Sequence, residues 1–224
     1  MVRFVVMAAG LATRMGRDKL ALPWKKTTVL GHVLQTVIEA IKLQKSVSSQ
    51  CRIEIHVVSR QPIETYISED DKKEFEERGG IWHYAPGPRP LAETIKIGLQ
   101  DLGSDVHSLA FLPGDQVGIT VHELSDCLDE VLRFLPDFLV PMAGEKTGAP
   151  VFFHKRYIPE LSELQGEQGG KVVLNRYPER WHKFPVGESL FYDVDTPEQY
   201  QALFAKACQG DGLSDIPVTK GPFP

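Results

Sequence analysis

The hydrophobic and polar positions of this chain fall into short apolar blocks separated by segments with helical periodicity. A continuous apolar run over residues 3–9, ended by Gly10, predicts a strand that is buried on both faces. Residues 10–26 are small or charged and are expected to form a loop. Thr28 precedes apolar residues at helical spacing as far as Ile41, so we expect it to cap a helix. The same patterns predict further strands at 52–59, 81–84, 108–113, 138–142, 149–153 and 181–185. They predict further helices at 63–78, 91–102, 121–134 and 196–207, and a helical segment with a Gly-rich break at 159–176.

This alternation of strands and helices indicates an α/β sandwich with a mostly parallel sheet. No stretch in the middle of the chain has the composition of a linker, so residues 1–208 are expected to form one domain. Residues 209–224 are rich in glycine and proline and are expected to form a loose tail. In sheets of this kind ligands bind beyond the carboxyl ends of the strands, so the residues that follow each strand are the first candidates for function.

Composition narrows the class of protein. The 224 residues are 42% hydrophobic and 25% charged, which excludes a disordered, collagen-like or coiled-coil chain. The net charge of −5 argues against non-specific binding to nucleic acid or to a membrane surface. No apolar run is long enough to span a bilayer. The three cysteines lack zinc-ligand spacing and are too few and too scattered for a disulfide framework, so we expect a reduced, cytoplasmic protein.

The loop after the first strand has the chemistry of an anion site. Ala8, Ala9 and Gly10 have small side chains, so their backbone N–H groups can approach an anion closely. Arg14 and Lys19 add two positive charges to the same loop. The loop is neither a P-loop nor a dinucleotide-binding loop. From the residues alone, a phosphate site and a surface turn with two solvated cations remain equally open.

Two acidic segments form the second candidate feature. Asp115 follows a predicted buried strand, and Asp193 and Asp195 precede the last predicted helix at alternate positions that share one face in extended chain. Taken singly, Asp115 suits a turn and Asp195 suits a helix cap. Taken together, the acids suit Mg²⁺, which binds a few carboxylate oxygens together with substrate phosphates.

The order of these motifs resembles a known family. The series Ala-Ala-Gly, Arg-Met-Gly, Lys-Leu and Leu-Pro-Trp over residues 8–24 is similar to the signature of the nucleotidyltransferases that mature molybdenum cofactor. The resemblance runs from about residue 5 to residue 204 and includes Asp-Val-Asp-Thr-Pro at 193–197. It implies a single-domain, three-layer α/β/α sandwich with a Rossmann-like sheet, of the nucleotide-diphospho-sugar transferase type. Ala9, where the guanylyl branch typically has Gly, is similar to the cytidylyl branch.

The resemblance also implies roles for individual residues. Ala8, Ala9 and Gly10 would contact the nucleotide, and Arg14 and Lys19 would hold its triphosphate. Asp115 and Asp195 would bind Mg²⁺ or Mn²⁺. The remaining matches concern the base and the acceptor: Thr94 would border the base, next to a Lys96 that is equally well explained as a solvated cation, and Gly169 and Lys171 would lie toward the acceptor.

Three positions depart from the family pattern. Ala12 stands where a serine is frequent, Val117-Gly118 follows Gln116 in place of a proline, and Ala149 replaces a histidine. The last two departures concern the acceptor side.

The resemblance implies transfer of CMP from CTP to the phosphate of the molybdopterin cofactor, with release of pyrophosphate. Two alternatives remain open within and outside this class of enzyme. The same fold would serve a guanylyl transfer from GTP or a transfer to a sugar phosphate. Alternatively, a non-catalytic chaperone would bind the cofactor and dock on a molybdenum hydroxylase.

Overall fold

The computed structural model describes residues 1–10, 16–44 and 52–210. Within this part of the chain, a central sheet of eight strands has the order β10-β7-β9-β6-β1-β4-β5, with β8 paired to β7. Strand β9 is antiparallel to β6 and β7, and the short β8 is antiparallel to β7, while the other neighbours are parallel. The strands are β1 Val2–Ala8, β4 Ile53–Ser59, β5 Ile81–Tyr84, β6 Ser108–Pro113, β7 Phe138–Ala143, β8 Lys146–Thr147, β9 Val151–His154 and β10 Trp181–Pro185, and β2 Pro23–Trp24 and β3 Thr27–Thr28 form a separate hairpin.

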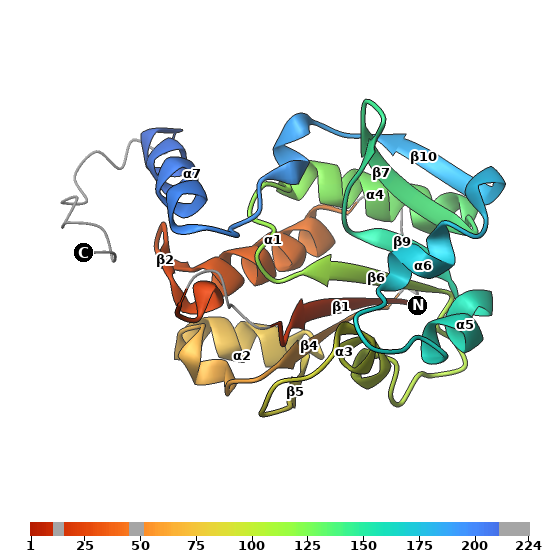
Figure 1. The fold of residues 1–224 in the computed structure, drawn as a ribbon, viewed down its shortest axis with the longest axis horizontal. Helices are drawn as coiled ribbons and strands as arrows, with labels where there is room; N and C mark the ends of the chain where they lie inside the picture. The colour runs from red at the N-terminus through yellow and green to blue at the C-terminus, as the bar shows by residue number, and fades with distance from the viewer. Residues whose placement is uncertain (11–15, 45–51, 211–224) are drawn as a thin grey trace.

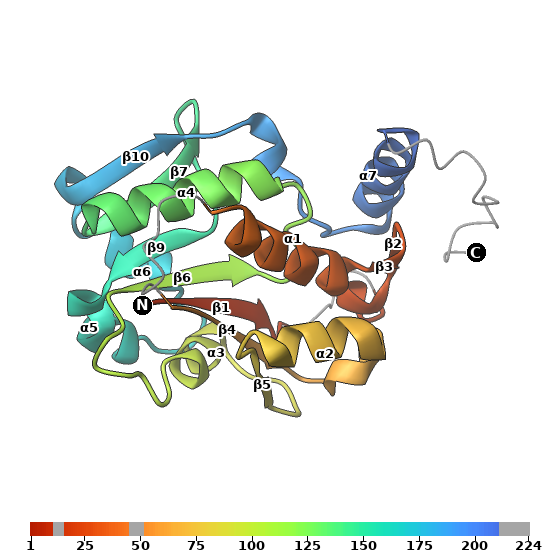
Figure 2. The same ribbon diagram turned by 180° about the vertical axis from the view of Figure 1, so that it is seen from behind.

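Helices cover both faces of this sheet, as Figures 1 and 2 show from opposite sides. Helices α1, α2 and α4 lie on one face, and α3, α5 and α6 lie on the other. Each face has its own apolar core. The helices are α1 Val29–Leu43, α2 Glu69–Glu77, α3 Leu91–Gly98, α4 Val121–Phe134, α5 Ile158–Ser162, α6 Gly170–Leu174 and α7 Pro197–Gly210. This arrangement confirms the predicted three-layer, mostly parallel α/β fold.

Local sequence explains where several elements begin and how closely they pack. The Thr28 side chain accepts a hydrogen bond from the Gly31 N–H at 3.0 Å, so it caps α1 as expected. Thr120 and Glu123 form a capping box at the start of α4. A Cβ on Gly98 would stand 2.3 Å from Cγ1 of Val5, so glycine is required for α3 to lie against β1.

The structure corrects several predicted boundaries. The expected loop at 10–26 contains a 3₁₀ turn, η1 Lys19–Ala21, and strand β2 of the hairpin, because these few residues bury Leu22 and Trp24 against α1 and α7. The expected helix at 63–78 divides into η2 Ile63–Thr65 and α2, since Ser68 starts a new helix by accepting from the Asp71 N–H. Segment 159–176 is helical with a break at its glycines, as predicted: α5 ends at Ser162 and α6 begins at Gly170. Further 3₁₀ turns are η3 Lys155–Tyr157, η4 Pro178–Arg180 and η5 Glu188–Phe191.

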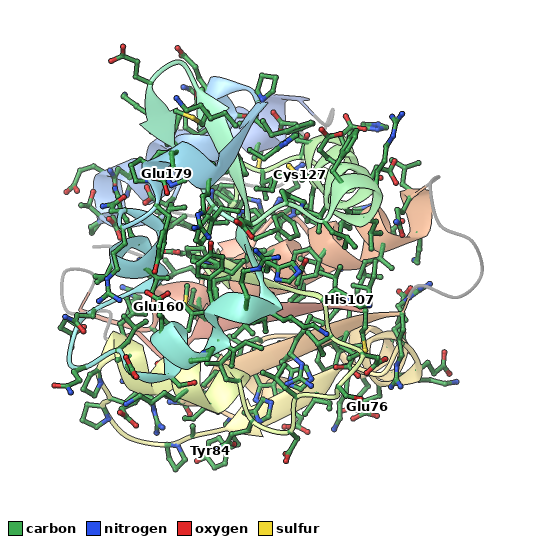
Figure 3. All side chains as sticks on the ribbon, turned by 90° about the vertical axis from the view of Figure 1, so that its right-hand side faces the viewer. Glu76, Tyr84, His107, Cys127, Glu160 and Glu179 are labelled. Carbon is green, nitrogen blue, oxygen red and sulfur yellow. The ribbon has the colours of Figure 1, made fainter. Side chains whose placement is uncertain are left out.

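Composition led us to expect no disulfide framework and no membrane-spanning segment, and the structure bears on both expectations. Cys127 on α4 is fully buried (Figure 3), and Cys208 on α7 is half-buried; both are free thiols. Cys51 lies outside the described residues. Across residues 1–10, 16–44 and 52–210, no helix is both long enough and apolar enough to cross a membrane.

Candidate active site

Parallel pairing brings the first loop and the first acid together at the carboxyl edge of the sheet. Met7 on β1 is paired with Pro113 on β6, and the Gly114 N–H donates to the Met7 carbonyl at 3.0 Å. Asp115 therefore follows directly beyond the end of β1, where Ala8 ends the strand. The two sequence motifs, separated by about a hundred positions, are neighbours for this reason.

Lys19 is the centre of the site. Its Nζ donates hydrogen bonds to Oδ2 of Asp115 and, at 2.8 Å, to Oδ1 of Asp195. Burial by itself lowers the pKa of Lys19, but the charges and hydrogen bonds of the two carboxylates outweigh it, so the pKa is raised from its ordinary value. Lys19 is therefore a full positive charge at neutral pH, held between two acids.

Backbone contacts hold the two acidic segments against each other. The Val194 N–H donates to the Asp115 carbonyl at 3.3 Å, and the Gly118 N–H donates to the Tyr192 carbonyl at 3.1 Å. The start of α7 does not depend on the Asp195 side chain, because the Thr196 hydroxyl accepts from the Gln199 N–H at 3.3 Å. The Asp195 carboxylate instead contacts Lys19, so the acids of the two motifs converge on one lysine.

Asp193 adds a third negative charge beside this pair. Its pKa is raised from the ordinary value by partial burial of the carboxyl and then by repulsion from Asp195 and Asp115. Asp193 also lines a neighbouring cavity. The shared face that the alternate spacing of Asp193 and Asp195 suggested is consistent with this mutual repulsion.

The donor set at this position suits a divalent cation that completes its coordination with substrate. Two carboxylates converge on a single cationic atom, Nζ of Lys19. No group of three or more His, Cys, Asp or Glu side chains arranged to hold a metal occurs among the residues described. Mg²⁺ is usually bound by one or two carboxylates plus phosphates and water, so Asp115 and Asp195 fit such an ion.

A cavity of about 310 Å³ opens next to the acids, on the side of β6, β9 and α6. Gln116 lies in its wall, and the Gln116 side-chain amide donates to the carbonyls of Ala149, at 3.0 Å, and Leu190, at 2.7 Å. Gln116 therefore joins three separate segments of the wall, a role that the motif analysis missed. The cavity is also lined by apolar and by charged side chains: Met7, Phe111, Phe153, Leu174 and Phe191 are apolar, and Lys171 and Asp193 are charged.

The remaining predicted site residues lie in different surroundings. Lys171, in the first turn of α6, lines the cavity, whereas a Cβ on Gly169 would stand 2.9 Å from Leu91, so Gly169 allows close packing on α3. Thr94 is buried within α3, and Ala9 is fully buried in the core on that face. A Cβ on Gly10 would meet nothing within 4 Å.

Two further expectations have different outcomes. Arg14 and Ala12 lie outside the described residues. Lys96 forms an ion pair with Glu93 at 3.1 Å on the surface of α3, as a solvated helix cation would.

The carboxyl edge of this α/β sheet therefore presents a lysine held between two acids. The chain belongs to the MobA-like NTP transferase domain family, whose sequence profile matches residues 4–181. It is therefore a nucleotidyltransferase.

Similar proteins include one curated relative and several solved structures. The chain is 26% identical over 204 residues to a probable molybdenum cofactor guanylyltransferase of Bacillus cereus (strain Q1), covering 88% of this chain and 92% of the relative. The structure of Rv0371c from Mycobacterium tuberculosis has a TM-score of 0.72 at 20% identity, covering 92% and 98% of the two chains. A complex of Rv0371c with manganese has a TM-score of 0.67 at 20% identity, covering 91% and 98%. Molybdopterin-guanine dinucleotide biosynthesis protein A from Archaeoglobus fulgidus has a TM-score of 0.59 at 17% identity, covering 93% and 99%. At these identities the solved structures show a common fold.

Proposed function

We propose that this nucleotidyltransferase transfers CMP from CTP to the phosphate of the molybdopterin-molybdenum cofactor and releases pyrophosphate. The contact of Lys19 with both Asp115 and Asp195, at the edge of the sheet beside a cavity, is the observation that carries the proposal. It supports the proposal because one hydrogen-bonded group then contains a cation that would bind phosphates and two acids that would hold a metal. The Bacillus cereus relative, whose name refers to molybdenum cofactor, supports the same acceptor.

The reaction needs no side-chain nucleophile. A phosphate oxygen of the acceptor attacks the α-phosphorus of the nucleotide, the new P–O bond forms, and the bond between the α-phosphorus and the bridging oxygen breaks. The bond electrons leave with pyrophosphate. The protein therefore has to position the two substrates and stabilise negative charge that builds up on the phosphates.

Lys19 and the first loop would perform the electrostatic part. In the nucleotide complex we expect Lys19 to exchange one of its carboxylate partners for phosphate oxygens, since its raised pKa keeps it protonated. The backbone of Ala8, Ala9 and Gly10 would approach the phosphates, and Arg14 would add a second cation. Asp115 and Asp195 would hold Mg²⁺ or Mn²⁺, which neutralises phosphate charge when it is bound.

The cavity supports a role in holding the acceptor. Its aromatic and aliphatic wall suits the flat ring system of a pterin, and Lys171 supplies a positive charge for an anionic group. Thr94, on α3, and Gly169, which packs against α3, would border the nucleotide and acceptor sides from outside this wall. Delivery of the product to a molybdenum hydroxylase or to a cofactor chaperone is part of the same proposal.

The sequence and the curated relative favour different nucleotides. Ala9 in place of glycine favours CTP, on the family pattern, whereas the name of the Bacillus cereus relative favours GTP as a second candidate. Thermal shift in the presence of Mg²⁺ with CTP, GTP, ATP and UTP separates the two. We expect the largest rise in Tm with CTP, and a rise with GTP alone would assign the guanylyl reaction instead.

Turnover provides the complementary test. Pyrophosphate release should require the preferred nucleotide, molybdenum cofactor and a divalent cation together, and it should stop when the cation is chelated. Release of pyrophosphate with a sugar phosphate but not with the cofactor would contradict the proposed acceptor. Absence of any nucleotide-dependent shift in Tm would contradict the proposed site.

A further inference from the structure

The carboxylate of Asp18 joins the turn that carries Lys19 to the core of the protein. One oxygen of Asp18, Oδ1, accepts a hydrogen bond from the Leu20 N–H at 3.1 Å and so starts the η1 turn. The other oxygen, Oδ2, accepts a hydrogen bond from the Tyr66 hydroxyl at 2.7 Å. Asp18 therefore joins the turn of Lys19 to a residue 48 positions away in the sequence.

Tyr66 is a rigid point of attachment. It is 2% exposed and its ring packs against Trp82 of β5 with 6.0 Å between the ring centroids. Its backbone carbonyl accepts a hydrogen bond from the Thr28 hydroxyl at 2.7 Å, and Thr28 is the cap of α1. The position of the Tyr66 hydroxyl is thus determined by β5, by α1 and by the apolar core between them.

The tyrosine also remains a hydrogen-bond donor at every pH at which the protein would work. Burial raises the pKa of Tyr66 far above its ordinary value, and the neighbouring Asp18 carboxylate raises it further. Asp18, for its part, is engaged by Leu20 and Tyr66, which leaves the acids Asp115 and Asp195 as the partners of the lysine that follows it.

The hydrogen bond of Asp18 to the Leu20 N–H is explained by capping of the η1 turn, but the position of this turn indicates a second role. Lys19 is the first residue of η1, so a rotation of the turn moves the root of the lysine side chain. Lysine is long and flexible, and ordering its side chain costs conformational entropy. A fixed root reduces the number of conformations in which Nζ misses its two partners.

We propose that Tyr66 and Asp18 are positioning residues that hold Lys19 in register with Asp115 and Asp195. The proposal deepens the proposed function, because it rests on Lys19 being the phosphate-binding cation. It assigns a role to a hydroxyl that neither the motif analysis nor the similar proteins pointed to. Neither residue contacts substrate in this proposal.

The experiment compares Tyr66→Phe with Tyr157→Phe. Both tyrosines are almost fully buried, and the Tyr157 hydroxyl also forms a hydrogen bond, accepting from Arg180 at 3.1 Å, on the opposite face of the sheet. The first measurement is the rate at which an amine-acylating reagent modifies Lys19, followed by peptide mass spectrometry. The second is kcat and KM for pyrophosphate release.

We expect Tyr66→Phe to increase the modification rate of Lys19 severalfold, because a lysine whose root is no longer held leaves its carboxylates more often and becomes accessible to the reagent. We also expect kcat to fall about tenfold with little change in the KM of the acceptor, as for a misplaced catalytic group. Tyr157→Phe should change neither quantity. Asp18→Asn, which retains an oxygen for the Leu20 N–H, should keep more activity than Asp18→Ala.

The possible results separate this proposal from the proposed function. If the rate of Lys19 modification and kcat in Tyr66→Phe both equal those of the wild-type protein, the positioning role is wrong. If the modification rate rises as expected but the wild-type protein transfers no nucleotide, the positioning of Lys19 stands and the proposed function is wrong. An equal rise in Tyr157→Phe would show a general loosening of the fold and would overturn the specific role.

Discussion

Gly118 lies so close to Ser189 that a Cβ on the glycine would stand 1.8 Å from the serine carbonyl oxygen. The same glycine donates its N–H to the Tyr192 carbonyl at 3.1 Å. The loop after Asp115 and the η5 segment that leads to Asp193 and Asp195 are therefore in direct backbone contact. The glycine at position 118 has a structural explanation here, because only a residue without a side chain permits this approach.

Substitution of this glycine tests whether backbone contact between the two acidic segments matters. Gly118→Ala should destabilise the protein by about 1–3 kcal/mol, since the backbone of η5 has to move to admit the methyl group. It should also lower pyrophosphate release, because the movement separates Asp115 from Asp195. Gly103→Ala is the matched control: its nearest neighbour, 2.6 Å from the new Cβ, is the mobile carboxyl end of Asp105. Denaturant unfolding and turnover measure both effects, and equal behaviour of the two variants would contradict this explanation.

Loss of the central lysine should separate catalysis from folding. Lys19→Ala is expected to reduce kcat/KM by at least about 100-fold, the usual effect of removing one group that stabilises charge in the transition state. The variant should remain folded, with a Tm that rises more steeply with Mg²⁺ concentration because Asp115 and Asp195 then repel each other without a partner. Lys96→Ala removes a surface cation paired with Glu93 and should leave turnover unchanged. Wild-type activity in Lys19→Ala would show that the first loop does not bind the phosphates.

Removal of the cavity lysine should affect the acceptor more than the nucleotide. Lys171→Ala is expected to raise the KM of the acceptor about tenfold, which corresponds to about 1.4 kcal/mol of binding free energy. The rise in Tm that the nucleotide causes should stay the same, because Lys171 lines the cavity, whereas the proposed phosphate site is the loop after β1. Lys155→Ala, on the η3 turn outside the cavity, is the control. A weaker nucleotide shift with an unchanged acceptor KM would reverse the assignment of the two sides.

A buried histidine pair should make stability depend on pH. Nδ1 of His56 lies 2.9 Å from Nε2 of His83, and burial, followed by the charge of Arg3, lowers the pKa of His56 to about 3. Because this folded-state pKa lies below the unfolded value of about 6.5, the stabilising effect is complete at pH 7 and is lost as the pH falls. The loss from His56 should be about 2 kcal/mol between pH 7 and pH 5.

Urea unfolding at the two pH values measures this loss. His56→Gln should unfold with a smaller difference between pH 7 and pH 5, whatever its absolute stability. His122→Gln, at an exposed position in the first turn of α4, is the control and should retain the full difference. An unchanged difference in His56→Gln would show that other groups cause the pH dependence.

The fold class followed from the pattern of the chain alone. Apolar runs such as 108–113 and amphipathic segments such as 121–134 correspond residue for residue to β6 and α4, since burial on two faces or on one leaves a direct trace in the sequence. Segments rich in turn residues were predicted less accurately. The hairpin β2–β3 depends on Trp24 packing against Tyr200 of α7, a contact across 176 positions that no local pattern records.

The site was determined in the same two stages. The sequence determined which residues carry charge and in which motifs they stand: Lys19, Asp115 and Asp195 were all predicted as site residues without a structure. Only the tertiary structure decided that the lysine lies between both acids, that Gln116 joins the walls of a cavity and that Asp18 is held by Tyr66. The physical reason is that charges and hydrogen bonds act over a few ångströms in space, and parallel pairing of β1 and β6 brings distant parts of the chain within that range.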